Sequence, residues 1–144
     1  MNGALPDVNV LLALVWPNHQ FHEQASTWYR THGSAGWSTC SITQLGFIRL
    51  SSNPSFTPYA KTPLESTMLL SNLVNQPAHR FIDDVPPASS DAYLAVAKNL
   101  QGYKQTTDAY LMVLARERDL MLITFDRKLK RYCPFESIVQ VLPT

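Results

Sequence analysis

The stretch that decides the fold is LMLITFD, residues 120–126. It begins with an unbroken apolar run, which is typical of a strand buried on both faces inside a parallel sheet. The segment before it predicts a helix over residues 108–118, with Thr106 or Thr107 as its N-terminal cap. A helix that leads directly into a buried strand is the repeating unit of α/β proteins.

The same alternation continues outward along the chain. Further helices are expected at residues 8–15, 21–31, 41–50, 64–74 and 91–100, and further strands at 3–5, 37–40, 79–82 and 138–142. Because the strands are short and apolar on both faces, helices must cover both sides of the sheet. We therefore predict an α/β fold, a three-layer α/β/α arrangement around a short central parallel sheet, as a single domain over residues 1–144.

Composition narrows the class of protein. The chain has 144 residues, of which 45% are hydrophobic and 16% charged, and its formal net charge is +1. These values exclude a disordered tail protein and a strongly basic nucleic-acid coat. Cys40 and Cys133 lie far apart in the sequence, so neither a disulfide framework nor a structural zinc site is expected.

The apolar run from Val10 to Trp16 has some likeness to the core of a signal peptide. However, no basic residue precedes it, Asp7 does, and Pro17 follows without a small-residue cleavage pattern. No run approaches the roughly 20 apolar residues that a membrane-spanning helix needs. We expect a soluble, cytoplasmic protein with no membrane partner.

Four oxygen-bearing side chains fall where they reach one edge of the predicted sheet. Asp7 follows the first strand, Asp126 follows the strand quoted above, and Asp108 opens the helix before that strand. Gln44 lies in the first turn of the helix at residues 41–50. Ligands of parallel α/β sheets bind at the carboxyl ends of the strands, so these side chains are the candidate catalytic residues.

Three carboxylates at one edge repel one another unless a cation lies between them. Hard oxygen ligands suit Mg²⁺, with Mn²⁺ as the alternative, and such ions bind phosphates readily. A metal held by Asp7, Asp108 and Asp126 would activate water to cleave a phosphodiester. Singly, each aspartate also has an ordinary explanation, as a helix cap, a favourable charge at a helix start, or a turn residue.

The three acidic segments resemble those of PIN domains. They read LPDVNVLLAL at 5–14, TDAYL at 107–111 with Ala115 following, and LITFD at 122–126. Two more segments are similar to VapC-type toxins of toxin–antitoxin pairs, especially the mycobacterial-type branch: WPNH at 16–19, and ITQLGFIR at 42–49 running on through SNP at 52–54. The likeness extends over nearly the whole chain and is least specific over residues 55–91.

The resemblance implies a PIN-like domain and a metal-dependent endoribonuclease, with Asp7, Asp108 and Asp126 at the acidic positions that hold Mg²⁺ or Mn²⁺. The fourth position is usually Glu and is Gln44 here, whose amide oxygen can bind a metal or orient water but cannot act as a base. Whether the site holds one metal or two therefore stays open. The resemblance also implies an RNA substrate, a cognate antitoxin that inhibits and assembles with the protein, and a homodimer.

Several neighbouring residues are expected to assist. Asn9 and Thr124 would hydrogen-bond the turns that carry Asp7 and Asp126, and so brace these carboxylates. Three cations are candidates for holding an RNA backbone: Arg49, Arg127 and Lys128. The alternative is a solvated surface turn for Arg127 and Lys128, and pairing with a nearby acid for Arg49.

Other residues receive a structural interpretation. His19, His22 and Glu23 have a spacing that shares one helix face, but no further metal ligand is placed nearby, so an exposed helix face is expected. The three tryptophans are expected in the core or an interface rather than as platforms for stacking bases: Trp16, Trp28 and Trp37.

Two alternatives to the ribonuclease remain open. With no charge at Gln44, the chain could be a degenerate PIN module that binds RNA or a partner without cleaving. Asp7-Val8-Asn9 also faintly resembles the opening motif of phosphatases that use an aspartyl nucleophile, although these need a second acid where Asn9 stands.

Overall fold

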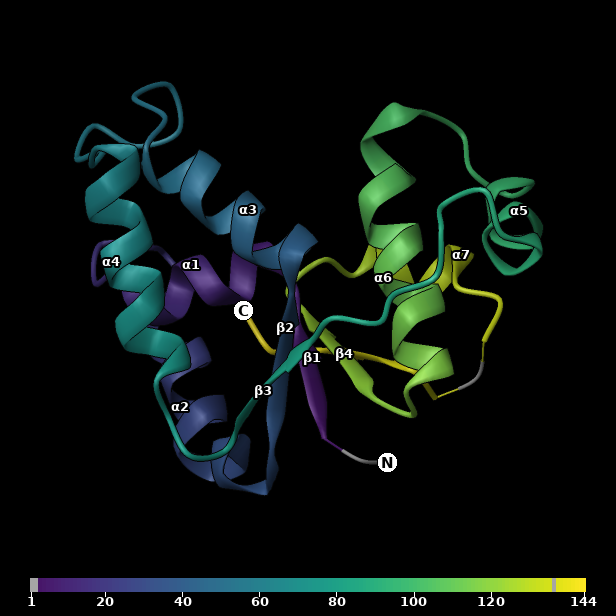
Figure 1. The fold of residues 1–144 in the computed structure, drawn as a ribbon, viewed down its shortest axis with the longest axis horizontal. Coiled ribbons are helices and arrows are strands. Elements are labelled where there is room, and N and C mark those ends of the chain that lie inside the picture. The colour runs from purple at the N-terminus through teal and green to yellow at the C-terminus, as the bar shows by residue number, and fades with distance from the viewer. Residues whose placement is uncertain (1–2, 136) are drawn as a thin grey trace.

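The computed structural model describes residues 3–135 and 137–144. Its five strands pair in parallel in the order β3-β2-β1-β4-β5, which confirms the predicted α/β fold with a short parallel sheet (Figure 1). The strands are β1 (Ala4–Pro6), β2 (Trp37–Cys40), β3 (His79–Ile82), β4 (Met121–Thr124) and β5 (Val139–Val141). The helices are α1 (Val8–Val15), α2 (His22–His32), α3 (Ser41–Ser51), α4 (Pro63–Val74), α5 (Asp91–Ala97), α6 (Thr106–Glu117) and α7 (Lys128–Tyr132).

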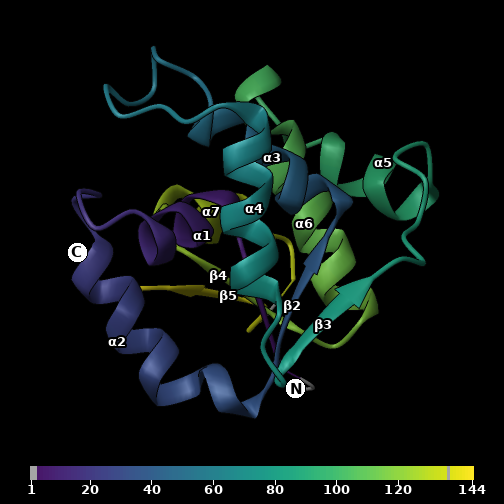
Figure 2. The ribbon, with the colours of Figure 1, turned by 60° about the vertical axis from the view of Figure 1, so that its left-hand side comes forward.

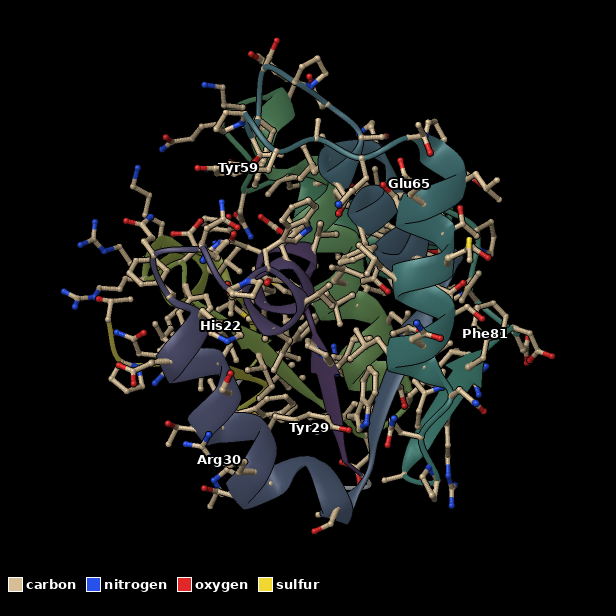
Figure 3. All side chains as sticks on the ribbon, turned by 90° about the vertical axis from the view of Figure 1, so that its left-hand side faces the viewer. His22, Tyr29, Arg30, Tyr59, Glu65 and Phe81 are labelled. Carbon is tan, nitrogen blue, oxygen red and sulfur yellow. The ribbon has the colours of Figure 1, made fainter. Side chains whose placement is uncertain are left out.

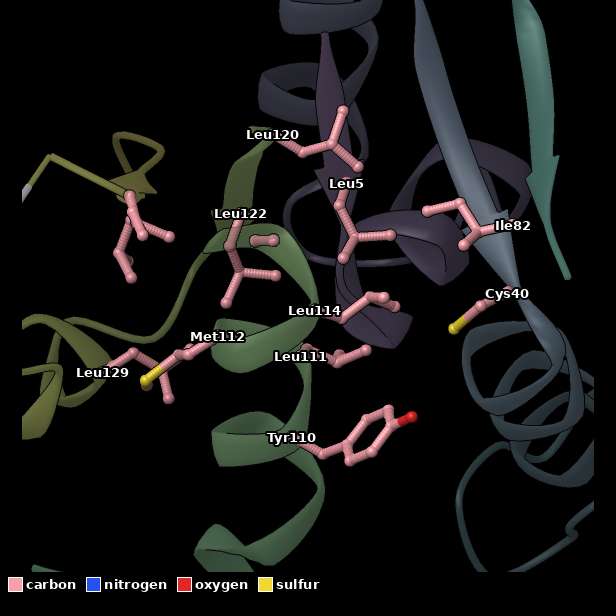
Figure 4. Close-up of a cluster of buried hydrophobic side chains, with 13 residues drawn as sticks. Leu5, Cys40, Ile82, Tyr110, Leu111, Met112, Leu114, Leu120, Leu122 and Leu129 are labelled. Carbon is pink, nitrogen blue, oxygen red and sulfur yellow. The ribbon is translucent and has the colours of Figure 1, made fainter. Parts of the chain in front are cut away.

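Helices cover both faces of the sheet, because successive strand residues point to opposite sides. Leu5 and Leu122 pack with α6 in one cluster, seen in close-up in Figure 4. Trp37 and Ile123 belong to a second cluster, on the side of α1 to α4. Figures 1 and 2 show α1 to α4 gathered on that side, and Figure 1 shows α5, α6 and α7 on the other.

The structure moves some of the predicted boundaries. Helix α6 begins at Thr106, with Gln105 as its N-cap, so the two expected cap threonines lie inside the helix. Helix α5 ends at Ala97 instead of continuing to residue 100. Beyond it the backbone N–H groups of Asn99 and Leu100 donate to carbonyls three residues back, a tighter turn that ends the α-helix.

Helix α7 is absent from the sequence-based prediction. It is only five residues long. Its first turn is held by Asp126, whose Oδ1 accepts from the backbone N–H of Lys128 at 2.9 Å. The side chain of Leu129 is fully buried in the cluster beneath it. Long-range packing therefore makes this helix, and a short polar stretch gave no periodic signal for it.

Cys40 and Cys133 are free thiols, as expected. Among the helices of the described residues, none is long and apolar enough to span a membrane.

Candidate active site

Asp7 stands where the central strand β1 passes into α1. Its backbone N–H donates to the carbonyl of Ile123 at 2.9 Å, which ties the end of β1 to β4. Its side chain is the N-cap of α1, with Oδ1 accepting from the backbone N–H of Val10 at 3.0 Å. A carboxylate has about four lone-pair positions, so this cap leaves it able to bind other groups.

The Asp7 carboxyl is buried, with 6% of the residue exposed. Burial raises its pKa to about 7, opposed by hydrogen bonds from the Thr124 hydroxyl and the Val10 N–H. The charges of Asp108 and Asp126 raise this pKa further. The three acids therefore lie close enough to sense one another.

Asp108 lies in the first turn of α6 and is half-buried. Its pKa is raised to about 6, first by burial and then by the charge of Asp126. Asp126 itself follows β4 and is exposed. The site therefore has a buried inner carboxyl and an outer side that water reaches.

Thr124, the last residue of β4, links two of the acids. Its Oγ1 accepts from the backbone N–H of Asp126 at 3.0 Å. The same hydroxyl hydrogen-bonds the Asp7 carboxylate. The expected contact of Thr124 with the turn that carries Asp126 is present, and the bond to Asp7 adds to it.

Gln44 lies in the first turn of α3, where its side chain joins a chain of hydrogen bonds. Gln44 Nε2 donates to Thr39 Oγ1 at 3.0 Å, and Thr39 Oγ1 lies 2.8 Å from His79 Nε2. The imidazole of His79 also donates a hydrogen bond to the backbone carbonyl of Val74. A carbonyl oxygen only accepts, so the ring nitrogen that makes this bond carries the proton. The other ring nitrogen, Nε2, therefore accepts from the Thr39 hydroxyl. Thr39 Oγ1 in turn accepts from Gln44, so the amide nitrogen of Gln44 points toward Thr39.

A tight contact holds this part of α3 beside the N-terminus of α1. A Cβ built on Gly46 would meet Val8 Cγ2 at 2.6 Å, so only glycine allows the two helices to approach this closely. Val8 is the residue after Asp7. The first turn of α1 therefore packs against the second turn of α3, with Asp7 at the head of α1 and Gln44 two residues before Gly46 in α3.

The donor chemistry of the acids fits a hard divalent cation. A buried carboxyl whose pKa is raised by two other carboxyls is relieved by positive charge. Within residues 3–135 and 137–144, no group of three or more His, Cys, Asp or Glu side chains is arranged so that these side chains alone could hold a metal ion. Mg²⁺ fits such an open arrangement, because it commonly keeps several waters and uses one or two carboxylates together with substrate phosphates.

We predicted that Asn9 braces the turn that carries Asp7, but its side chain bonds to His19 instead. Its Oδ1 pairs with His19 Nε2 at 3.0 Å, and His19 Nδ1 accepts from the backbone N–H of Phe21. His22 Nδ1 donates to the carbonyl of Ala13 at 2.6 Å. Both histidines are half-buried, so the expected exposed histidine face is wrong: they hold the segment after α1 in place.

Tyr132, in the last turn of α7, is a neighbour that sequence reasoning missed. Burial raises its pKa to about 12, and the charges of Asp108 and Asp126 add to the effect. Its phenol therefore lies near the acids and stays protonated at neutral pH. Had α7 been predicted, the four-residue spacing between Lys128 and Tyr132 would have placed both side chains on the same face of the helix that follows Asp126.

The candidate RNA-binding cations are all exposed. Arg127 and Lys128 follow Asp126 directly, at the start of α7, where the Arg127 guanidinium lies 3.3 Å from Thr144 Oγ1. Arg49 lies in the last turn of α3, away from the first turn that carries Gln44.

Comparisons with known proteins agree with this architecture. The family model of the PIN domain matches residues 4–133. Ribonuclease VapC38 of Mycobacterium tuberculosis is 41% identical over 124 residues, which cover 85% of this chain and 84% of VapC38.

Two solved structures share the fold. VapC20 of Mycobacterium tuberculosis, a Sarcin-Ricin loop cleaving toxin, has a TM-score of 0.70 at 11% identity, with 97% of this chain and 99% of VapC20 covered. VapBC2 of Rickettsia felis, bound to a DNA fragment from its promoter, has a TM-score of 0.61 at 12% identity, with 98% and 99% covered. The chain therefore belongs to the PIN-domain family, among its VapC-type members.

Proposed function

We propose that the chain is a metal-dependent endoribonuclease, the toxin of a type II toxin–antitoxin pair, which hydrolyses phosphodiester bonds of cellular RNA. The observation that carries this proposal is the meeting of three carboxyls from elements far apart in the sequence. At one edge of the parallel sheet, the charges of Asp108 and Asp126 add to the burial that raises the pKa of Asp7, and the charge of Asp126 adds to the burial that raises the pKa of Asp108. Kinship with VapC ribonucleases supports the same activity.

Asp7, Asp108 and Asp126 would hold Mg²⁺ or Mn²⁺. When bound, such an ion supplies an activated water and stabilises the charge that develops on the phosphate. Asp7 closes the inner side of the site, and the exposed Asp126 leaves the outer side open to water and RNA. Gln44 orients the attacking water with its amide oxygen and takes no proton, because a carboxamide is not a base at neutral pH.

Exposed cations would hold the RNA strand by its phosphates. Arg127 and Lys128 lie directly after Asp126, so phosphates bound there would be adjacent to the site. Arg49, at the other end of α3, would hold a more distant part of the strand.

A cognate antitoxin would inhibit this protein by covering the same edge of the sheet, and toxin and antitoxin would form a hetero-oligomer around a toxin homodimer in the cytoplasm. The fold shared with the VapBC2 toxin–antitoxin structure supports such a partner.

A PIN module that binds without cleaving is the second candidate. Gln44 lacks the charge of the usual glutamate, and the described carboxyls form no ready metal cage. Calorimetric titration separates the two: an active enzyme binds Mg²⁺ or Mn²⁺ in the free protein, and a pure binding module does not. The phosphatase alternative gains no support, because Asn9 pairs with His19 where a second acid would be needed.

The test is cleavage of RNA by the purified chain without its antitoxin. Cleavage should require Mg²⁺ or Mn²⁺ and should stop with EDTA or in Asp7→Asn. Asp91→Asn is the matched control, since Asp91 is an exposed acid in the first turn of α5, outside the site. Cleavage that survives both EDTA and Asp7→Asn would refute the proposed mechanism.

A further inference from the structure

A cavity of about 230 Å³ opens between the C-terminal ends of α1 and α3 and the loop that follows α3. Figure 3 looks onto this side of the molecule, with Tyr59 in that loop above and His22 at the start of α2 below. The residues so far assigned to the candidate site do not line it. Its volume lies below the range of about 300–1,000 Å³ that is typical of pockets for drug-sized ligands, so it suits a small group such as one planar ring system.

Three of the ten residues that line the cavity carry aromatic rings, and two of these rings are held in place by hydrogen bonds. Trp16 Nε1 donates to the buried Ser51 Oγ at 3.0 Å, which fixes the indole ring. His19 is fixed from both sides by its bonds with Asn9 and the backbone of Phe21. Phe56, in the loop, is 40% exposed and presents an apolar ring at the mouth.

The polar groups of the lining are neutral. They include the amides of Asn18 and Gln20 and the hydroxyl of Thr57. The pKa of His19 is lowered by burial and by the neighbouring His22, so its ring is uncharged at neutral pH. A lining without charge does not suit a phosphate or a carboxylate, whereas amides and hydroxyls match the donor and acceptor edge of a nucleobase.

The cavity is coupled to the acidic edge. Its lining residues Leu12 and Trp16 follow Asp7 by five and nine positions along α1, a rise of about 7.5 Å and about 13.5 Å, which a few nucleotides of a single strand can span. On the other side, the Phe21 ring packs on Phe125 with ring centroids 4.8 Å apart, and Phe125 precedes Asp126. A strand whose phosphate lies at the acids can therefore place a nearby base in the cavity.

We propose that this cavity binds one unpaired nucleobase of the RNA substrate, between the Trp16, His19 and Phe56 rings, a few nucleotides from the scissile phosphate. The proposal rests on the ribonuclease function proposed above and deepens it, because a base held at fixed distance sets where the strand is cut. Trp16 packs against the core cluster beside α1 to α4 as expected, and it also lines this cavity.

The first experiment measures binding without cleavage. Full-length Asp7→Asn protein is titrated with short single-stranded oligoribonucleotides that carry 2-aminopurine at each position in turn. Stacking in the cavity quenches the fluorescence at one position. Phe56→Ala should weaken binding of that oligonucleotide by about 5- to 150-fold, as expected for loss of one base–aromatic stack.

Matched variants separate stacking from disturbance of the loop. Phe56→Trp restores a stacking ring and should restore affinity and quenching. Tyr59→Ala removes another exposed aromatic of the same loop, 63% exposed and outside the cavity lining, and should change neither. An oligonucleotide with an abasic residue at the quenched position should bind the Asp7→Asn protein and its Phe56→Ala derivative equally.

The failures are distinguishable. If the wild-type chain cleaves no RNA with Mg²⁺ or Mn²⁺, the ribonuclease proposal fails, and the binding result still decides whether the cavity takes a base. If the wild-type chain cleaves but no position is quenched, or Phe56→Ala binds like its parent, the cavity proposal is overturned. Loss of antitoxin affinity in Phe56→Ala with RNA affinity unchanged would overturn it too, in favour of an antitoxin side chain as the occupant.

Discussion

The Thr124 hydroxyl hydrogen-bonds the buried Asp7 carboxylate and accepts the backbone N–H of Asp126 at 3.0 Å. One side chain at the end of β4 therefore positions two of the three acids. It also stabilises the ionised form of Asp7, against the burial that disfavours it.

Thr124→Val should raise the pKa of Asp7 above its present value of about 7, because the bond that lowers it is lost. Less of the carboxyl is then ionised at neutral pH, so the acidic limb of the cleavage profile should move to higher pH. The measurement is a pH–rate profile at saturating Mg²⁺. Thr124→Ser keeps the hydroxyl and serves as the control; coincident profiles for valine and serine would contradict the assigned role.

The stability of the metal-free protein should fall as the pH rises from acid to neutral. The folded-state pKa values of Asp7 and Asp108, about 7 and about 6, exceed the ordinary aspartate value of 3.8, so the folded state binds more protons in this window. The stabilising contribution of the protonated carboxyl is full below the unfolded-state pKa and is lost as the pH rises through the folded-state pKa. For Asp7 it amounts to about 4 kcal/mol at most.

Urea unfolding at about pH 5 and about pH 8 tests this dependence. Asp7→Asn cannot ionise at this position and should show a flatter profile than the wild type. At the higher pH, Mg²⁺ should restore stability to the wild type by binding the ionised carboxyls. An equal pH dependence in wild type and Asp7→Asn would show that Asp7 is not the titrating group.

Gln44→Glu should strengthen metal binding by about tenfold, because it adds a fourth carboxylate at the site. The same change disturbs the Gln44–Thr39–His79 chain, since a carboxylate accepts from Thr39 where the amide donated. We therefore expect tighter Mg²⁺ binding by calorimetry together with a lower Tm in the metal-free state. In a background that already carries Thr39→Val, Gln44→Glu should lower the Tm very little, because the hydrogen bond it disturbs is already absent. An unchanged affinity of Gln44→Glu for Mg²⁺ would show that Gln44 lies outside the metal site.

Lys128→Ala should weaken RNA binding similarly for all sequences and reduce the slope of log affinity against log salt by about 0.7, as for loss of one phosphate contact on a single strand. The measurement is binding to the Asp7→Asn protein over a salt series. Arg30→Ala, an exposed cation of α2 seen in Figure 3, provides the control and should leave the slope unchanged.

The sequence predicts a parallel sheet but not the order of its strands, yet this suffices to place the acids at one edge of the sheet. Asp7 and Asp126 follow buried strands, and parallel strands end at one edge, so their proximity follows from topology alone. The orientation of Gln44 could not be predicted, because it depends on His79, thirty-five positions away in the sequence. The same holds for α7, which depends on a cap from Asp126 and the burial of Leu129.

The segment between α1 and α2 was also beyond prediction. The spacing of His19 and His22 on the chain suggested an exposed helix face, whereas each ring is bonded back onto α1, at Asn9 and Ala13. No local sequence pattern indicates that the chain after α1 folds back onto that helix.

Besides the catalytic role proposed for it, Asp7 serves the fold, since its carboxylate caps the first turn of α1. Replacement by alanine would remove the charge and the cap together, at about 1 kcal/mol for the cap alone, and would confuse inactivity with partial unfolding. Asparagine caps helices as well as aspartate does. Asp7→Asn, which replaces one carboxylate oxygen by an amide nitrogen, should therefore give an inactive but folded protein that cells can overproduce without toxicity.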